Sequence, residues 1–254
     1  MDCLPVQEGE LMHRFFTDPE PGPDGAVYLS PEDARHALTV LRLKTGQHIE
    51  VIRDGLRWDA EIGRIDAQRV SVRILSPLPS TEPLLSVTLF QGLPKADKMD
   101  LIVQKATELG VSRIVPVLMN RCITRPDAKD MVRKTERWQK IAREAGKQSG
   151  RCVVPEIAGP VSLNRLAGNS IPETNIVPWE EAAGFGPLAF RNRYPSLSSL
   201  GILIGPEGGI EKEEIDCLQA AGFIPVTLGR RILRTETAGI AALSSFMSLY
   251  GEME

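Results

Sequence analysis

Residues 200–222 have the sequence LGILIGPEGGIEKEEIDCLQAAG, in which a strand, a tight turn and a helix follow one another. The apolar run at 200–204 is typical of a buried strand. A glycine-rich turn begins at Gly205, and apolar residues at helical spacing predict a helix over 211–221 that a glycine ends. A buried strand followed directly by a helix is the unit from which parallel sheets are built.

The same alternation runs from residue 85 to the end of the chain. Strands are expected at 85–89, 111–118, 200–204 and 225–228, and helices at 97–109, 136–145, 211–221 and 237–250. This order predicts an α/β domain whose parallel sheet is covered by helices on both faces. Residues 162–199 lack a comparable pattern, apart from Trp179-Glu180-Glu181, and no role is assigned to them beyond spanning to the last strand.

The N-terminal part has a different pattern. Alternating apolar residues predict strands at 48–53, 57–62 and 70–75, and Asp54-Gly55 predicts a hairpin between the first two. A serine cap, a proline and an acidic turn precede a short helix expected at 36–42. These elements together predict a small β-barrel.

Three prolines separate the two parts. Pro77, Pro79 and Pro83 lie within residues 76–84, and proline favours an extended linker there because it has no amide hydrogen for a sheet. The expected division is an N-terminal β-barrel at 1–78, a linker at 79–84 and an α/β domain at 85–254.

Composition narrows the classes of function. Hydrophobic residues make up 42% of the chain and charged residues 25%, as in soluble globular proteins. The 30 basic and 33 acidic residues give a net charge of −3, so any nucleic-acid surface must be local. Residues 113–151 carry 11 basic and 4 acidic residues, which favours a face for a polyanion; a solvated helix face is the alternative.

No apolar run reaches the roughly 20 residues of a membrane span, and the acidic start does not resemble a secretory signal, so a cytoplasmic protein without a membrane partner is expected.

Neither a disulfide framework nor a metal site is expected. The four cysteines are far apart and form no C-x-x-C pair, and the histidines do not combine with them at metal-ligand spacing. The residues concerned are Cys3, Cys122, Cys152, Cys217, His13, His36 and His48.

Three strand ends carry unusual loops, and in open parallel sheets ligands bind beyond the carboxyl ends of the strands. They are Gln91-Gly92-Leu93-Pro94-Lys95, Gly205-Pro206-Glu207-Gly208-Gly209 and residues 228–238, LGRRILRTETA. The second loop lacks the phosphate-binding glycine and lysine motifs, and its glutamate would repel a phosphate. An acidic glycine-rich loop suits hydroxyls, amines or a positive centre, unless it is only a strand-to-helix turn.

The third loop concentrates positive charge. Arg230, Arg231 and Arg234 are suited to nucleic-acid phosphate, and Arg234 or Glu236 to orienting a reacting group. In the purely structural interpretation, Thr235 or Thr237 is the N-cap of the following helix.

These motifs resemble one family. Residues 205–209 and 228–238 resemble the two C-terminal signatures of the RsmE family, and so do QGLPKADKMDLIVQKATELGVSRIVPV at 91–117 and KQSGR at 147–151. Residues 36–42, with Arg14-Phe15-Phe16, are similar to its N-terminal pattern. The resemblance covers nearly the whole chain. Members are SPOUT-class methyltransferases that methylate N3 of one decoding-site uridine, uridine 1498, in 16S ribosomal RNA.

The resemblance implies a PUA-like RNA-binding barrel and an α/β domain with a deep trefoil knot, a topology that general rules would not predict. It also implies a homodimer that acts on the 16S rRNA of the small ribosomal subunit. The helix at 99–109 and the final helix are expected near the dimer interface.

The methyl donor that the resemblance implies is S-adenosyl-L-methionine. Its adenine needs an apolar slot, and its sulfonium suits an acidic loop; no metal is needed, because the methyl group is already activated. The pocket residues that the resemblance implies are Leu203, Ile204, Gly205, Pro206, Glu207, Gly208, Gly209, Leu228, Gly229, Ile232, Leu233, Arg234, Thr235, Thr237 and Ala238.

The implied reaction is an in-line displacement in which the uridine N3 loses its proton and attacks the methyl carbon, so positioning carries much of the catalysis. Arg234 is the first candidate to stabilise the uridine anion, and Glu236 and Glu207 are candidates for a base or an orienting group. The base must be unpaired to expose N3. The expected RNA contacts are Arg14, His36, Arg42 and Lys95.

Three other functions stay open at this point. They are a SPOUT methyltransferase for tRNA or another rRNA base, a non-catalytic RNA-binding or ribosome-assembly module, and a nucleotide-binding α/β enzyme. The intact loops at 205–209 and 228–238 argue against the second, and the missing phosphate-loop motif argues against the third.

Overall fold

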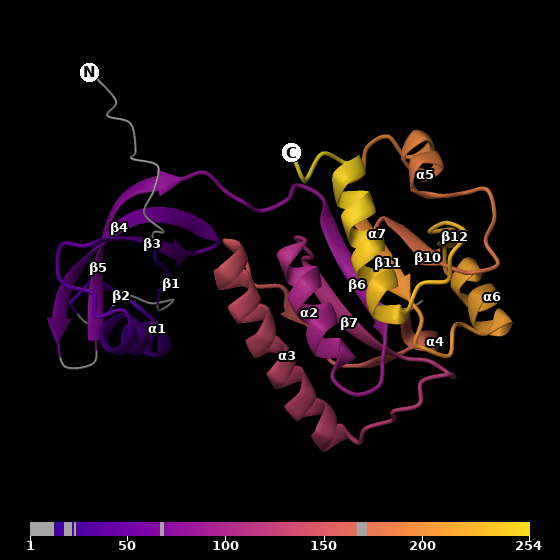
Figure 1. Ribbon diagram of the computed structural model, residues 1–254, viewed down its shortest axis with the longest axis horizontal. Coiled ribbons are helices and arrows are strands. Elements are labelled where there is room, and N and C mark those ends of the chain that lie inside the picture. The colour runs from indigo at the N-terminus through magenta and orange to yellow at the C-terminus, as the bar shows by residue number, and fades with distance from the viewer. Residues whose placement is uncertain (1–12, 18–21, 23, 67–68, 167–171) are drawn as a thin grey trace. The chain divides into compact units, whose positions relative to one another are not determined.

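The computed structural model describes residues 13–17, 22, 24–66, 69–166 and 172–254. The chain divides into two compact units, Met1–Thr81 and Glu82–Glu254. Figure 1 shows strands and one short helical region in the first unit, and a sheet with flanking helices in the second.

The N-terminal unit is built on one curled sheet with the strand order β1-β3-β4-β5-β2. Its strands are β1 (Arg14–Phe16), β2 (Val27–Tyr28), β3 (His48–Arg53), β4 (Leu56–Asp66) and β5 (Arg69–Leu78). The predicted hairpin is confirmed, because Asp54 and Gly55 have φ angles of 54° and 73° between the antiparallel strands β3 and β4. One face of the sheet is buried, with Phe15, Ile49 and Val70 in its core.

Strand β5 is longer than the strand predicted at 70–75 and includes residues 76–78 at the start of the proline-rich stretch. Pro77 pairs with Trp58 of β4. Among the residues that the structure describes, β2 pairs with β5 at Val72 and Ser71 and not at Pro77, so the proline's missing amide hydrogen removes no described bond on that side. Residues 79–84 contain no helix or strand.

The helical region begins earlier than predicted, with α1 (Pro31–Arg35) followed by the π-helical segment η1 (His36–Val40). The predicted cap is confirmed, because the Asp33 amide donates to the Ser30 hydroxyl at 3.2 Å. The Asp33 carboxylate is itself buried and accepts the Phe16 amide at 2.8 Å. A tertiary bond therefore anchors the first turn, which local spacing alone did not indicate.

The C-terminal unit is an α/β fold with a parallel sheet, as predicted. The strand order is β12-β10-β11-β6-β7-β8, with β9 also pairing with β7, and every pairing is parallel. Its strands are β6 (Ser86–Gly92), β7 (Arg113–Leu118), β8 (Glu156–Ile157), β9 (Val161–Ser162), β10 (Thr174–Pro178), β11 (Ser199–Ile204) and β12 (Phe223–Val226). Its helices are α2 (Lys98–Glu108), α3 (Ala128–Ser149), α4 (Leu163–Leu166), α5 (Pro187–Arg193), α6 (Lys212–Ala220) and α7 (Thr235–Leu249).

Two features of this unit differ from what the sequence indicated. Residues 162–199, to which no role was assigned beyond spanning, include β10, which lies between β11 and β12, and the helix α5. A five-residue strand buried on both faces has no alternation to reveal it. Helix α3 begins at Ala128 rather than 136, because the Asp127 carboxylate caps it by accepting the Asp130 amide at 2.8 Å.

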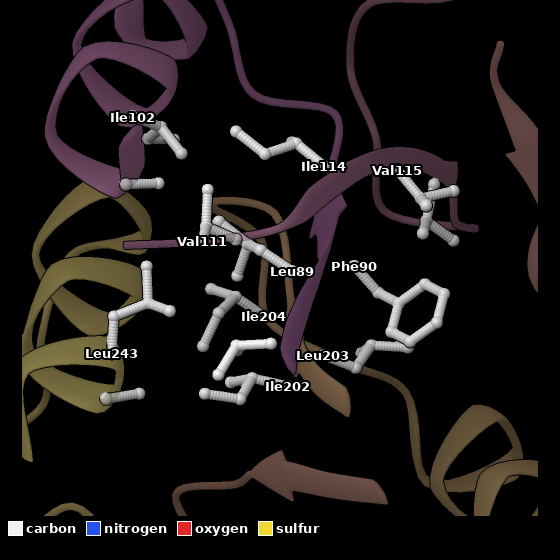
Figure 2. Close-up of a cluster of buried hydrophobic side chains, with 14 of the residues drawn as sticks. Leu89, Phe90, Ile102, Val111, Ile114, Val115, Ile202, Leu203, Ile204 and Leu243 are labelled. Atoms are coloured by element: carbon white, nitrogen blue, oxygen red, sulfur yellow. The ribbon is translucent and has the colours of Figure 1, made fainter. Parts of the chain in front are cut away.

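Apolar side chains fill both faces of this sheet. Figure 2 shows Leu89, Ile204 and Leu243 gathered on one side, whereas Phe90 and Leu203 point to the other. Leu243 comes from α7, which packs on α2 and β11. This arrangement leaves the loops at the carboxyl ends of the strands to form a site. The trefoil knot stays a prediction.

A buried ion pair joins the start of this unit to the KQSGR motif. Arg151 is buried, and its Nε and Nη2 donate to Glu82 Oε2 at 3.2 and 2.6 Å. Its Nη1 also donates to the carbonyl of Thr107. Glu82 Oε1 in turn accepts the amide of Cys152 at 2.6 Å. The pair therefore connects three segments that are far apart in the sequence.

We predict that Arg151→Met lowers the free energy of unfolding by about 3–5 kcal/mol, because it removes the charge partner of the Glu82 carboxylate and the guanidinium donor to the Thr107 and Val111 carbonyls. Urea denaturation followed by circular dichroism measures the loss. The matched control is Arg113→Met, whose pair with Glu156 is exposed and whose loss costs less than about 1 kcal/mol. Equal losses of unfolding free energy in the two variants would contradict the larger contribution that we assign to the buried Arg151–Glu82 pair.

Candidate active site

A cavity of about 470 Å³ lies at the carboxyl ends of the neighbouring strands β10, β11 and β12. Its walls come from the loops that follow these strands and from the first turn of α7. The lining residues are Pro178, Trp179, Glu180, Ile204, Gly205, Pro206, Glu207, Gly209, Ile210, Thr227, Leu228, Gly229, Arg230, Arg231, Ile232, Leu233, Arg234, Thr235 and Ala238. The position is the one expected for ligand binding in an open parallel sheet.

Most of the predicted pocket residues line this cavity, but three do not. Leu203 is fully buried in the core, on the same side as Phe90. The Gly208 carbonyl accepts a hydrogen bond from Arg121 Nη1 at 2.9 Å, and Thr237 is exposed on α7. Trp179 and its neighbours also line the cavity, although the sequence did not indicate them, because they follow β10, a strand without a recognisable sequence pattern.

Two loops touch each other along their backbones at the edge of the cavity. A Cβ on Gly92 would lie 2.6 Å from the Pro206 nitrogen, so only glycine fits there. Gly205 is equally crowded, since a Cβ on it would lie 2.6 Å from Ile210 Cγ1. The loop after β6 and the loop after β11 therefore hold one another in place.

Thr235 ties three loops together and is not the N-cap. Its hydroxyl donates to the Gly205 carbonyl at 2.6 Å and accepts from Gln91 Nε2 at 2.9 Å. Gln91 is fully buried, and its Nε2 also donates to the Gly92 carbonyl at 3.0 Å. The N-cap of α7 is Arg234, whose side chain makes no capping bond, so the interpretation of Thr235 or Thr237 as a cap is wrong. The hydroxyl of Thr235 has a tertiary partner that is 30 residues away in the sequence.

Lys98 brings two of the candidate catalytic residues together. Its Nζ lies 3.0 Å from Glu207 Oε1 and 3.2 Å from Glu236 Oε2. The hydrogen bond to Glu207 is the main cause that raises the pKa of Lys98; burial opposes it, and Glu236 adds to it. Burial acts to raise the pKa of Glu207, but backbone hydrogen bonds and Lys98 outweigh it and lower that pKa. No local pattern indicated Lys98, because both partners are more than 100 residues away.

The rim of the cavity is positive and its wall is partly acidic. Arg230, Arg231 and Arg234 are exposed, and among the residues that the structure describes none forms an ion pair with them. Glu180 and Glu207 line the wall. This arrangement suits a polyanion at the rim and a ligand with a positive centre inside.

The RNA contacts predicted in the N-terminal unit have different surroundings. Arg14 Nε and Nη2 donate to Glu50 at 2.6 and 3.0 Å, which gives this arginine a structural partner. His36 is exposed, and its ring lies 6.5 Å from that of Phe15. Arg42 is exposed and has a φ of 53°. The contacts of all three with RNA stay predictions.

Lys95 belongs to the other unit. Its side chain is exposed, and its backbone amide donates to Glu207 Oε1 at 3.1 Å. The contact of Lys95 with RNA also stays a prediction.

Cysteines and metal ligands add nothing to this site. Cys122 and Cys152 are buried, Cys217 is exposed, and Cys3 lies outside the described residues. Within the described ranges, no group of three or more His, Cys, Asp or Glu side chains is placed to hold a metal ion. Nor does any helix in these ranges have the length and apolar character to cross a membrane.

Comparison with known proteins assigns the fold and the site to a class. A family model described as an RNA methyltransferase domain matches residues 80–247, and one described as an RNA methyltransferase PUA domain matches residues 29–75. The chain is therefore an RNA methyltransferase with a PUA domain.

Relatives identify the family within this class. The chain is 34% identical over 224 residues to ribosomal RNA small subunit methyltransferase E of Bacillus subtilis, covering 85% of this chain and 88% of the relative. The crystal structure of the Neisseria gonorrhoeae methyltransferase E bound to S-adenosyl methionine has a TM-score of 0.82 at 33% identity and covers 96% of this chain and 100% of that one. A Legionella pneumophila methyltransferase in complex with the cofactor SAM has a TM-score of 0.81 at 33% identity, with coverages of 93% and 97%. The chain belongs to the ribosomal RNA small subunit methyltransferase E family, the RsmE family, and the resemblance seen in the sequence is confirmed.

We predict that Thr235→Val lowers the free energy of unfolding by about 1–3 kcal/mol, because it removes one of the two acceptors of the buried Gln91 amide and the hydroxyl donor to the Gly205 carbonyl. Thr235→Ser keeps the hydroxyl and retains most of the stability. Thr237→Val is the matched control on the exposed side of α7, and it stays within about 0.5 kcal/mol. Urea denaturation of the three variants checks this, and a loss shared by the serine variant would assign the effect to the methyl group instead.

Proposed function

We propose that this chain transfers the methyl group of S-adenosyl-L-methionine to N3 of a decoding-site uridine, uridine 1498, in the 16S rRNA of the small ribosomal subunit. We place it in the cytoplasm and expect it to act as a homodimer. The observation that carries the proposal is that the cavity walls consist largely of residues 205–209 and 228–238, the two C-terminal signatures of the family. The names of the relatives and the cofactor bound in the neighbouring structures support it.

The cavity fits such a donor in size and in chemistry. About 470 Å³ lies within the range of roughly 300–1,000 Å³ that is usual for small-molecule sites. Ile204, Leu228 and Leu233 supply apolar surface for an adenine ring. Gly209 and Gly229, with φ angles of 76° and 107°, let the backbone approach a ligand closely.

The acidic part of the wall suits the positive centre of the donor. Glu180 and Glu207 line the cavity, and carboxylates favour a sulfonium or an ammonium over a phosphate. When bound, the donor supplies a methyl group that its sulfonium has already activated, so the protein residues mainly have to hold and orient the two reactants.

Arg234 is the residue that we assign to the uridine. It lines the cavity at the N-cap of α7, where its side chain is exposed and has no ion-pair partner among the described residues. A guanidinium beside O2 or O4 stabilises the negative charge that develops when N3 loses its proton. Glu207 and Glu236, joined through Lys98, are the candidates for accepting that proton or orienting the base.

The same rim suits the RNA around the target base. Arg230 and Arg231 are exposed beside the cavity and are suited to bind the phosphates that flank the uridine. The uridine has to leave its pair to present N3, and a cavity open at a positive rim can receive an extruded base. Arg14, His36 and Arg42 of the N-terminal unit and Lys95 of the other unit are proposed as further contacts.

The function is tested by transfer of labelled methyl groups from S-adenosyl-L-methionine to purified small subunits that lack the modification, with the product located by mass spectrometry. We expect N3-methyluridine at position 1498. Label on tRNA or on another rRNA base would replace the substrate with that RNA. A protein that binds the donor but labels none of these RNAs would contradict the proposed substrate, and one that does not bind it would favour a non-catalytic RNA-binding module.

We predict that Arg234→Ala lowers kcat by about 10²–10³-fold, because it removes the cation proposed to stabilise the uridine anion, while the Kd of the donor changes little. Steady-state methyl transfer and isothermal titration with the donor measure the two effects. Arg165→Ala, on the exposed side of α4, is the control and leaves both unchanged. An equal loss of donor binding and turnover would make Arg234 a pocket residue without a catalytic role.

A further inference from the structure

Lys98 occupies a position that is unfavourable for a lysine. It is the first residue of α2, where the partial positive charge of the helix terminus disfavours a cation. Acidic Asp97 and Asp100 lie beside it in the sequence, but the ion pairs that Asp97 and Asp100 form are with Arg137 of α3. The partners of Lys98 are instead Glu207 and Glu236, so its charge is placed by tertiary contacts.

The three side chains are largely covered from solvent. The exposed fractions are 30% for Lys98, 21% for Glu207 and 18% for Glu236. Ion pairs at this degree of burial are screened less than surface pairs, so they hold their geometry more firmly. Both carboxylates face the same ammonium group, and each would repel the other without it.

The cluster joins three loops at the cavity. Lys98 begins α2, directly after the loop that follows β6. Glu207 lies in the loop after β11, lines the cavity, and also accepts the Lys95 amide at 3.1 Å. Glu236 is the second residue of α7, two positions after Arg234. The position of Lys98 therefore governs both the acidic wall of the cavity and the first turn of the helix that carries Arg234.

We propose that Lys98 is a positioning residue for methyl transfer, which fixes Glu207 in the cavity wall and the first turn of α7 through its two ion pairs. This inference rests on the proposed function. Lys98 does not line the cavity, so it acts through Glu207 and Glu236 and needs no contact with the reactants. The lowered pKa of Glu207 supports the proposal, because Lys98 contributes to it.

The pH dependence of turnover follows from the groups that face Glu207. These are the Lys98 ammonium on α2, the Lys95 amide in the loop after β6, and the Glu236 carboxylate on α7, which shares Lys98. With Lys98 present, the lowered pKa keeps Glu207 ionised until the pH is well below neutral. Without it, burial and the Glu236 charge raise the pKa of Glu207, and activity that needs the ionised form is lost at a higher pH.

We predict that Lys98→Met lowers kcat by about 100-fold, as expected when reacting groups lose their alignment, while the donor Kd changes less than about threefold. The acidic limb of the kcat profile moves upward by about one pH unit. Lys98→Arg keeps a cation between the two carboxylates and restores both turnover and the profile. Methyl transfer to small subunits from pH 5 to pH 9, with calorimetric titration of the donor, measures these effects.

Lys105→Met is the matched control, because Lys105 lies on the same helix and pairs with its neighbour Glu108 at 2.9 Å, away from Glu207 and Glu236. It leaves kcat and its pH profile unchanged. An unchanged kcat and profile in Lys98→Met, with wild-type protein active in the same assay, would overturn the role of Lys98. Wild-type protein that transfers no methyl group would instead overturn the proposed function.

The thermal stability of the protein without substrate tests the ion-pair cluster independently of methyl transfer. In Lys98→Met the Glu207 carboxylate loses the ammonium that helps to lower its pKa and ionises with less compensation as the pH rises, so the loss in Tm relative to wild type is larger at pH 8 than at pH 5. Lys98→Arg removes most of that difference. A Tm loss that is the same at both values would contradict the electrostatic coupling on which the positioning role depends.

Discussion

Thr235 donates its hydroxyl hydrogen to the Gly205 carbonyl and accepts the Gln91 amide, so one side chain joins β6, the loop after β11 and the start of α7. This connection holds the loop after β11 and the first turn of α7 together, and both of these segments line the cavity. The backbone contact between Gly92 and Pro206 shows how closely they approach. The hydrogen bonds of Thr235 stabilise this arrangement directly. Breaking them would also leave buried polar groups without a hydrogen-bond partner, which costs free energy.

Charge is distributed around the cavity in two layers. Glu180 and Glu207 lie in the wall, where Lys98 pairs with Glu207 and leaves the wall with a net negative charge, whereas the arginines of residues 230–234 stand exposed at the rim. This separation reconciles a net charge of −3 with a nucleic-acid substrate, because only the rim has to meet phosphate. It also keeps the acidic wall available for a ligand with a positive centre.

Local sequence patterns indicated some elements of this protein correctly and missed others. The hairpin at Asp54-Gly55 and the helix α2 followed from local turn chemistry and from the spacing of apolar residues. Strand β10 escaped detection because it is short and buried on both faces, and with it the cavity residues that follow it were missed. Thr235 looked like a cap because a threonine before an apolar helix is usually one, whereas its real partners are Gly205 and Gln91.

The amino-acid sequence alone determined the parallel α/β class, the capped first turn at Ser30, the loops at 205–209 and 228–238, and the family to which they belong. These features depend on neighbouring residues or on long motifs, which a linear pattern contains in full. Only the tertiary structure decided which loops share the cavity, because that follows from the strand order β12-β10-β11-β6. It also decided that Lys98 meets Glu207 and Glu236, since contacts between residues more than 100 positions apart depend on how the sheet is assembled and leave no periodic signal in the chain.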